Sequence, residues 1–591
     1  MRISYTVSME KPQTHFFRVR IDVREVSDDH LDFTMPVWAP GSYLVRDFSR
    51  HVRSFRAVST SDGRSLEVQR LDKSTWRVRT GMSREVSVEY EVYANEFTVD
   101  TSHLDASHGY FNGTSVLMYI EGYKDQSCEL VIVPYGDWTV STSLERIGEN
   151  RFRAPSYDIL ADSPVEIGKH RVLSFTVQGK PHEIVIYGHG NEDEKRLVED
   201  IGKIVEAFAS MFGQLPYRKY TFIFHLVSPE VGSGGLEHLS STTIDIDMFT
   251  FRPREKYIRF LSVVAHEFFH LWNVKRIRPS ELGPFNYKQE NYTNFLWIAE
   301  GFTNYYSYVA LYRAGIISEK EYFEHIMESI RIHELLPGSR RVSAYESSFD
   351  AWIKLYKPTP NNYNSYISYY LKGEILGLIL SIWIADVTNG QKSLDDLFRQ
   401  LFEKYKKDGK GYGEKEILNT IQDVTNHDFT DFFRRYASNP GPIDFDSELA
   451  KIGVRIIRKY EKLGGTDEVE RGYLGLVVRD AGGKYIVDGV LEGTPAYEAG
   501  INEGDELVAI NGYRFTDRLL RPLRKENGKL KTDYLVDTRP GETVSVSVFR
   551  RDTLLTIDVT AATAPHDTFE PEISDDRSSR QYTLRNKVLR G

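Results

Sequence analysis

The chain has 591 residues, which is too long for a single hydrophobic core and predicts several domains. Its 40% hydrophobic and 13% aromatic residues exclude intrinsic disorder over most of the length. A net charge of −10 argues against a nucleic-acid-binding protein, and the single cysteine, Cys128, excludes an intrachain disulfide and a cysteine-based zinc site.

Residues 1–170 predict a β-rich N-terminal domain. Short segments such as "ISYTVSM" and "REVSVEYEVYA" alternate apolar and polar residues, and turn residues such as those of "WAPGSY" at 38–43 separate them. The first 17 residues lack the apolar core of a signal peptide. We therefore expect a cytoplasmic protein.

Residues 171–455 predict a mainly helical domain that begins with strands. "HEIVIYGHG" and "KYTFIFHLV" are typical of strands, and from about residue 255 the apolar residues recur at three- and four-residue spacing. The longest apolar run, "ILGLILSIWIA" at 375–385, is too short to span a bilayer and predicts a buried helix. The expected partners therefore exclude a membrane.

The stretch "VVAHEFFHLWN" at 263–273 predicts a zinc site. On a helix, His266 and His270 lie one turn apart on the same face, with Glu267 beside them. Two neutral imidazoles suit zinc, and Glu267 is the expected general base that takes a proton from the attacking water. A buried helix with incidental histidines is the alternative, and a third ligand decides against it.

Glu300 is that candidate third ligand. It lies in "LWIAEGFTNYY" on the next predicted helix, flanked by apolar and aromatic residues. A carboxylate in such a stretch is costly to bury unless it is paired or binds a metal. A surface glutamate at a helix bend is the alternative interpretation.

Two further motifs are compatible with a peptidase. In "GGLEH" at 234–238, Gly234 and Gly235 allow close approach of a substrate backbone, and Glu237 can face its ammonium group. A plain hairpin turn is the alternative. In "YYLKG" at 369–373, the phenol of Tyr370 can donate to the oxyanion of a tetrahedral intermediate.

Together these motifs resemble the gluzincin aminopeptidases and, among them, the glycyl aminopeptidase family. The resemblance extends from "WAPGSYLVRDFSRHV" at 38–52 to about residue 562. It implies a multidomain α+β protein with a β-rich N-terminal domain, a thermolysin-like peptidase domain and a C-terminal PDZ domain. It also implies one Zn²⁺ per chain, small N-terminal residues as substrates, and the following roles: zinc ligands His266, His270 and Glu300; base Glu267; transition-state donor Tyr370; exopeptidase element Gly234, Gly235 and Glu237. The better-known gluzincin aminopeptidases have a shorter gap before the ligand glutamate, and their exopeptidase motif ends in Asn where this chain has His238.

The C-terminal part predicts a PDZ-like domain over 456–562 and a disordered tail over 563–591. "YLGL" at 473–476 resembles a carboxylate-binding loop, and "EGTPAYEAGINEGDELVAINGYRF" at 492–515 follows it. Such domains bind peptide C-termini by adding a strand to a sheet edge. A structural domain without a free groove is the alternative. The tail contains the polar run "SDDRSSRQ".

The sequence thus favours a zinc aminopeptidase acting on peptides with free N-termini. The nearest alternative is a zinc endopeptidase in which the PDZ-like domain selects substrates. A non-catalytic peptide-binding scaffold would have lost a ligand or the base, and all four residues are present. Iron(II) also binds two histidines and a carboxylate, but the adjacent Glu267 favours hydrolysis.

Overall fold

The computed structural model describes residues 1–229, 232–405, 409–460, 470–516, 519–521, 524–526, 529–531, 534–535 and 538–591. These residues divide into two units. The first comprises Met1–Tyr292, Tyr306–Ile316 and Phe402–Tyr412, and the second comprises Thr293–Tyr305, Ile317–Leu401 and Gly413–Gly591.

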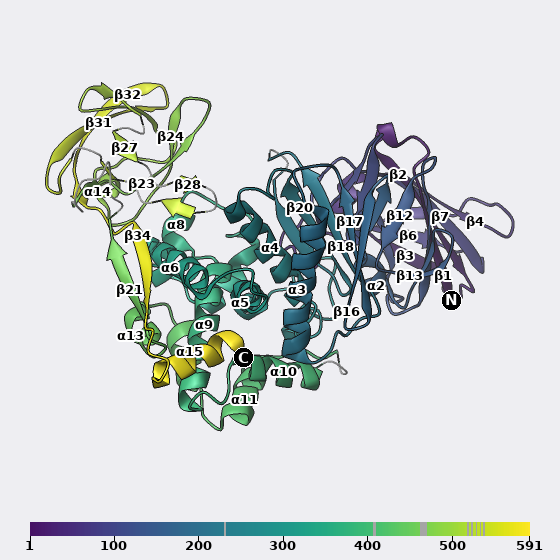
Figure 1. Cartoon of the computed structure of the whole chain (residues 1–591). Coiled ribbons are helices and arrows are strands. Elements are labelled where there is room, and N and C mark those ends of the chain that lie inside the picture. Colours follow the sequence, from purple (N-terminus) through teal and green to yellow (C-terminus); the bar gives the residue numbers. More distant parts are fainter. Residues whose placement is uncertain are drawn as a thin grey trace. The chain divides into compact units, whose positions relative to one another are not determined.

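Three β-sheets make up the N-terminal part of the first unit (Figure 1). The largest has the order β13-β14-β11-β1-β2-β7-β4, with strands Glu145–Gly148, Arg151–Ala154, Cys128–Val133, Arg2–Ser8, Phe16–Arg24, Glu85–Tyr93 and Val52–Ser59. The second is β10-β3-β6-β5, with strands Tyr119–Ile120, His30–Thr34, Thr75–Arg79 and Val68–Arg70. The third is β12-β15-β9-β8, with strands Thr139–Thr142, Val165–Gly168, His108–Phe111 and Ser102–Leu104. The prediction of a β-rich N-terminal domain is confirmed.

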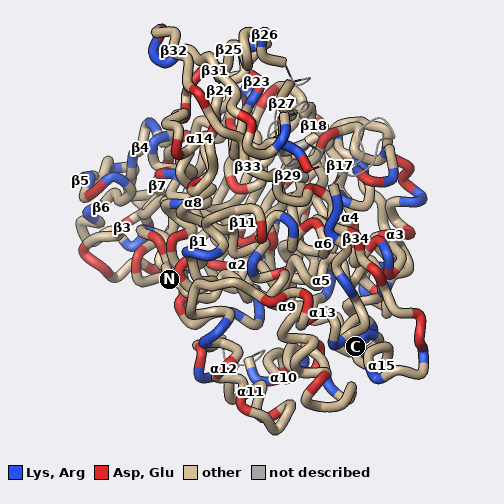
Figure 2. Tube along the Cα trace, turned by 90° about the vertical axis from the view of Figure 1, so that its left-hand side faces the viewer, with Lys and Arg blue, Asp and Glu red and all other residues tan. Residues whose placement is uncertain are grey.

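Apolar alternation explains these sheets. Burial alternates along β1, where Tyr5 and Val7 are buried and pair with Ile21 and Val19 of β2. The opposite faces carry charges, such as the ion pair of Arg53 with Glu91 across β4 and β7. Basic and acidic residues are interspersed along these strands (Figure 2).

The first unit continues into a five-stranded sheet whose strand β19 contains the GGLEH motif. Its order is β16-β17-β18-β20-β19, with strands Arg171–Val177, Lys180–Tyr187, Tyr220–Val227, Ser241–Asp247 and Gly234–Glu237. β18 lies parallel to both neighbours and is buried along its whole length. Helices α3 (Glu194–Phe212) and α4 (Arg254–Phe269) pack beside the sheet (Figure 1), with α4 against Phe222 and Phe224, whereas His225 on the other face contacts Glu166 of β15. β19 forms the edge of the sheet.

The second unit contains the remaining helices of the middle part of the chain. They are α6 (Glu319–Leu335), α7 (Ala344–Phe349), α8 (Asn362–Ser365), α9 (Tyr369–Val387), most of α10 (Leu394–Tyr405), α11 (Glu414–Thr425), α12 (Thr430–Phe432) and α13 (Phe445–Ala450). α9 contains the apolar run 375–385 and is buried over most of its circumference, as predicted. It packs against a π-helix, η5 (Trp297–Gly301), which α5 (Phe302–Arg313) continues.

A second core within this unit belongs to the C-terminal domain. Its main sheet has the order β23-β24-β25-β31-β32, with strands Leu476–Asp480, Tyr485–Val490, Glu506–Ile510, Thr543–Arg550 and Thr553–Thr560. Val487, Val546 and Val548 are among its fully buried residues. β23 is an edge strand of this sheet. The "YLGL" segment at 473–476 begins at the end of β22 (Gly472–Tyr473) and ends at the first residue of β23.

The prediction of a disordered tail over 563–591 is wrong. β34 (Thr568–Ile573) pairs antiparallel with β21 (Val454–Lys459), and α15 (Arg580–Arg590) packs on α9. Leu584 and Val588 are fully buried, and the buried Arg585 donates to the Ile452 and Ser574 carbonyls. The polar run that suggested disorder covers mainly the loop before the helix, where Ser579 caps the N-terminus of α15.

The second unit also holds three short helices that connect its main elements. They are η6 (Pro337–Arg340), η7 (Asp350–Trp352) and the π-helix η8 (Phe433–Ser438).

In the part of the chain that the structure describes, no helix is both long and apolar enough to cross a membrane.

Candidate active site

The two histidines of the HEXXH motif converge at the end of α4. His266 lies in its last turn and His270 is its C-cap residue. Their Nε2 atoms are 3.0 Å apart, close to the separation of about 3.3 Å that two nitrogens 2.0–2.1 Å from one tetrahedral zinc ion would have. The pair therefore has the geometry of two ligands of one ion.

The orientation of His270 is set by its other ring nitrogen. Nδ1 lies 2.6 Å from the carbonyl oxygen of Asn273, and because a carbonyl only accepts hydrogen bonds, Nδ1 carries the proton. The lone pair of Nε2 is then directed to His266. This is the arrangement that orients metal-binding histidines in proteins.

Glu267 lies against the edge strand β19. The residue is 6% exposed, and a methyl group added at Gly235 would lie 2.1 Å from its Oε1 atom. Only a residue without Cβ fits there. A methyl group at the neighbouring Gly234 would meet nothing within 4 Å. The second glycine of "GGLEH" therefore makes room for the carboxylate of Glu267.

The GGLEH motif forms a strand and not a hairpin turn. Gly234–Glu237 pairs antiparallel with β20, so its other edge lies at the margin of the sheet. Glu237 is 3% exposed and belongs, with Glu267 and His270, to a group whose ligand-type atoms lie within 4.8 Å of one another. Glu237 is thus close to the HEXXH motif, as its expected role requires.

His238 faces away from this group, toward Asp162. Its Nδ1 atom is 3.1 Å from Asp162 Oδ1, and Lys275 Nζ is 2.9 Å from the same oxygen. Burial alone would raise the pKa of Asp162, but the Lys275 ammonium and the His238 ring outweigh it and lower that pKa to about 2. Lys275 Nζ also lies 3.9 Å from Glu237 Oε1, so the cluster of Asp162, His238 and Lys275 contacts the Glu237 carboxylate through Lys275.

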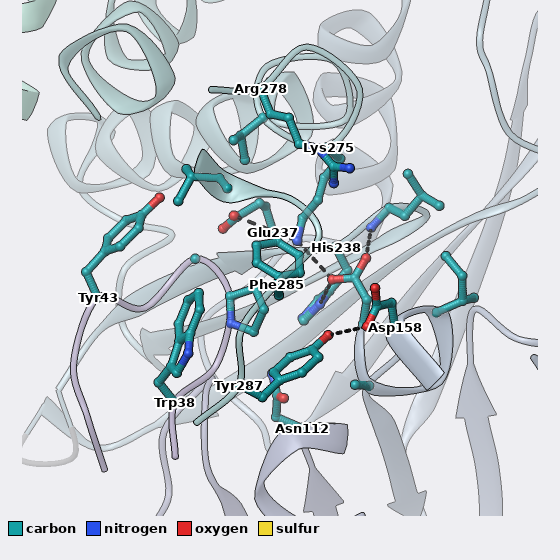
Figure 3. Close-up of a pocket in the computed structure, with 18 residues that line it drawn as sticks. Trp38, Tyr43, Asn112, Asp158, Glu237, His238, Lys275, Arg278, Phe285 and Tyr287 are labelled. Atoms are coloured by element: carbon teal, nitrogen blue, oxygen red, sulfur yellow. Dashed lines mark hydrogen bonds and ion pairs between the residues drawn. The ribbon is translucent and has the colours of Figure 1, made fainter. Parts of the chain in front are cut away.

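A cavity of about 120 Å³ borders Glu237 (Figure 3). The loop that carries Trp38 and Tyr43, in the N-terminal β-rich part, forms one wall. A methyl group at Gly41 of this loop would lie 2.7 Å from Glu237 Oε2. The loop backbone therefore lies directly against the carboxylate. Phe285 and Tyr287 complete the aromatic lining.

Glu300 is buried in the π-helix η5, where it is 2% exposed. The sequence predicted an ordinary helix here, whereas the structure has a π turn, a feature that often occurs at functional sites. Phe269 stacks on Tyr306 of α5, six residues after Glu300 in the same continuous helix, with ring centroids 4.5 Å apart. A buried carboxylate of this kind is costly unless it is paired or binds a metal ion, which agrees with the ligand role expected for Glu300.

The helix that carries Tyr370 crosses η5 at two glycines. A methyl group at Gly301 would lie 2.4 Å from the Cα of Gly373, and one at Gly373 would lie 2.3 Å from the Trp297 carbonyl oxygen. The glycine of "AEGF" thus meets the glycine of "YYLKG". This backbone contact holds the first turn of α9, and hence Tyr370, close to the turn that carries Glu300.

Tyr370 itself is half-buried near the start of α9. Its hydroxyl lies 3.5 Å from that of Tyr356, and its ring stacks on Tyr369 at 4.7 Å. Burial raises the pKa of Tyr369 well above its usual value, and the charges of Tyr356, Tyr370 and Glu300 add to this effect. Tyr370 therefore lies in a group of phenols beside Glu300.

Sequence reasoning missed the residues that support the site. Asn273 lies three residues after His270, a spacing that could have suggested a backbone partner for its ring. Asp162 and Lys275 gave no such signal, because Asp162 is separated from His238 by 76 positions and from Lys275 by 113.

Comparison with known proteins finds three family models along the chain. They are the peptidase M61 N-terminal domain over residues 4–169, the M61 glycyl aminopeptidase over 259–376, and a PDZ domain over 472–561. No curated protein matches the chain.

Among solved structures, an aminopeptidase N family protein from Idiomarina loihiensis shares 29% identity. The match covers 99% of this chain and 100% of that one, with a TM-score of 0.90. An M1 zinc metallopeptidase from Deinococcus radiodurans shares 10% identity over 75% of this chain and 94% of that one, with a TM-score of 0.46. Aminopeptidase A of Legionella pneumophila shares 13% identity over 82% of this chain and 55% of that one, with a TM-score of 0.47.

Proposed function

The matches identify this chain with the M61 glycyl aminopeptidase family of metallopeptidases, and we propose that it removes small N-terminal residues, Gly or Ala, from peptides with one zinc ion. The observation that carries the proposal is the pair of His266 and His270 with Glu267 beside it, and Glu300 is the proposed third ligand. Two imidazoles and one carboxylate are the donor set of catalytic zinc sites of this type.

The donor set fits a zinc ion in its details. His270 donates from Nδ1 to the Asn273 carbonyl, which leaves Nε2 as its ligand atom, and Glu300 is a buried carboxylate, which is stable when it neutralises a cation. Bound zinc lowers the pKa of water to about 7 and polarises a carbonyl group.

Two side chains act on the reacting atoms in this proposal. Glu267 takes the proton of the attacking water and passes it to the leaving amine, and its position against Gly235 holds the carboxylate for this transfer. Tyr370 donates its phenol hydrogen bond to the oxyanion that forms at the peptide carbonyl. The stacking of its ring on Tyr369 supports this role by limiting its motion.

The loop that contains Trp38 and Gly41 lies against Glu237 and supports the preference for a short N-terminal residue. Glu237 accepts hydrogen bonds from the substrate ammonium, and the edge of β19 at Gly234 and Gly235 pairs with the substrate backbone. Because the loop at Gly41 already contacts the Glu237 carboxylate, a residue anchored there meets this loop and Trp38 within its first side-chain atoms.

A zinc endopeptidase is the second candidate, and the PDZ domain favours it. A domain that captures peptides at the edge strand β23 could hold long chains by their C-termini. The same capture would serve an aminopeptidase by retaining a substrate between successive cleavages.

Blocked and free substrates distinguish the two candidates. Purified protein is assayed on Gly- and Ala-p-nitroanilide and on N-acetyl-Gly-p-nitroanilide, with a chelator control and the Glu267→Gln variant. Turnover of only the free amines, abolished by chelation and in the variant, supports the aminopeptidase. Equal turnover of the blocked substrate moves the assignment to the endopeptidase, and no turnover on any of them contradicts both.

A further inference from the structure

A second group of metal-ligand side chains lies on the hairpin β8–β9 of the N-terminal part. Asp105 and His108 flank the two-residue turn Ala106–Ser107, and the Asp105 amide donates to the His108 carbonyl at 2.9 Å. Alternate residues of a strand share a face, and cross-strand partners share it too, so His103, Asp105 and His108 all project from one face of the hairpin.

The three side chains converge on a small volume. Their ligand-type atoms lie within 4.8 Å of one another. His103 Nε2 is 3.3 Å from Asp105 Oδ2, and His108 Nδ1 is 3.9 Å from Asp105 Oδ1. Two donors 2.0–2.1 Å from a tetrahedral zinc ion lie about 3.3 Å apart, so the His103–Asp105 pair already has this separation and the His108–Asp105 pair must close by about 0.6 Å.

The imidazole of His108 is poorly satisfied without a ligand. It is fully buried, and its Nε2 atom has no hydrogen-bond partner among the described residues. The closest hydrogen-bonding contact of Nδ1 is with Ser107 Oγ at 3.5 Å, the limit for a hydrogen bond. Nδ1 is the nitrogen that faces Asp105, so a cation held between these two side chains would replace this weak contact.

Aromatic rings and a buried ion-pair cluster surround the group. Tyr187 of β17 stacks on His108 with ring centroids 3.5 Å apart, which restrains the plane of this imidazole. The neighbouring His225 is paired with both Glu166 and Asp245, so it has acidic partners of its own outside the group.

We propose that His103, Asp105 and His108 form a second metal site that takes Zn²⁺ or a related first-row divalent ion, separate from the HEXXH centre. Two imidazoles and one carboxylate select such ions over Ca²⁺ and Mg²⁺. All three ligands belong to the hairpin, so metal binding would cross-link its two strands and stiffen the turn, in which Ser107 hydrogen-bonds through Oγ to the Tyr187 hydroxyl at 2.7 Å.

The test uses the full-length chain with the HEXXH centre removed by His266→Ala and His270→Ala. Zinc content after dialysis and zinc affinity by competition with a chromophoric chelator are measured in this background. It is then combined with Asp105→Asn, whose amide oxygen can still accept the turn hydrogen bonds of the Ser107 and His108 amides, so the hairpin is retained. His103→Gln is the second variant. His170→Gln, which alters a nearby imidazole outside the group, is the matched control.

We expect about one zinc ion per chain in the background and in the His170→Gln control. Asp105→Asn and His103→Gln should each weaken zinc binding by more than about 10-fold and abolish the rise in melting temperature caused by added zinc. A background protein that binds no zinc, or binding that Asp105→Asn leaves unchanged, overturns the proposal. Because none of these readouts uses peptidase activity, failure here leaves the proposed function standing.

Discussion

Replacing Gly235 by alanine tests whether β19 holds the general base in position. The added Cβ atom would lie 2.1 Å from Glu267 Oε1, whereas ordinary van der Waals contact begins at 3.4 Å. The carboxylate must therefore move by the difference, 3.4 − 2.1 = 1.3 Å, or the strand must shift by a similar distance. Gly234→Ala is the matched control, because its Cβ meets nothing within 4 Å.

The magnitude follows from the role of Glu267. General acid–base catalysis contributes about 10²- to 10⁴-fold, and a misplacement of about 1 Å can cost about 10²-fold. We therefore expect Gly235→Ala to lower kcat by about 100-fold, equivalent to about 2.7 kcal/mol of activation free energy. KM should change less, since the zinc ligands and Glu237 remain. The free energy of unfolding should also fall, by about 1–3 kcal/mol, because the added methyl group displaces the Glu267 side chain, so kcat is compared at a temperature where the variant is folded.

The assay is the steady-state hydrolysis of Gly-p-nitroanilide by five proteins: wild type, Gly234→Ala, Gly235→Ala, Glu267→Gln and the double variant that combines the last two substitutions. Zinc content and melting temperature are measured on each. If the two substitutions act through the same carboxylate, combining Gly235→Ala with Glu267→Gln should lower kcat no further than Glu267→Gln alone. A Gly235→Ala variant within threefold of wild type, or one that loses activity only as much as Gly234→Ala does, would refute the reasoning.

Three further predictions concern stability. Gly373→Ala, whose Cβ would lie 2.3 Å from the Trp297 carbonyl oxygen, should lower the free energy of unfolding by about 3 kcal/mol in urea, whereas Gly441→Ala, with open space around it, should not. The pKa of the partly buried Asp162 is lowered to about 2, so its contribution to the free energy of unfolding is complete above its unfolded pKa of about 3.9 and is lost as the pH falls toward 2. Asp162→Asn should therefore make the free energy of unfolding less sensitive to acid between these two pH values, and an unchanged pH profile would contradict this. Deletion of residues 564–591 removes β34 and α15 and should lower the melting temperature by several degrees, since α9 loses the packing of Leu584; an unchanged melting temperature would show that the tail adds no stability.

Much of the site was open to prediction from local patterns. The HEXXH motif predicted the paired histidines because residues four apart share a helix face, and the apolar flanks of Glu300 predicted its burial. The "GGLEH" motif predicted a place near the substrate, but its strand character depends on pairing with β20, which the sequence does not display. The ordered tail was missed because its partners, β21 and α9, are distant in the chain.

The sequence by itself determined the order of the domains, the strand-rich N-terminal part, the buried helix α9 and the identity of the residues on the HEXXH helix. These features depend on periodicity and on short spacings, which are written along the chain. Only the tertiary structure decided that Gly235 makes room for Glu267, that Gly301 meets Gly373, and that Asp162 holds Lys275 and His238 behind Glu237. Each of these joins segments far apart in sequence, where packing and burial, and not local propensity, set the position of a side chain.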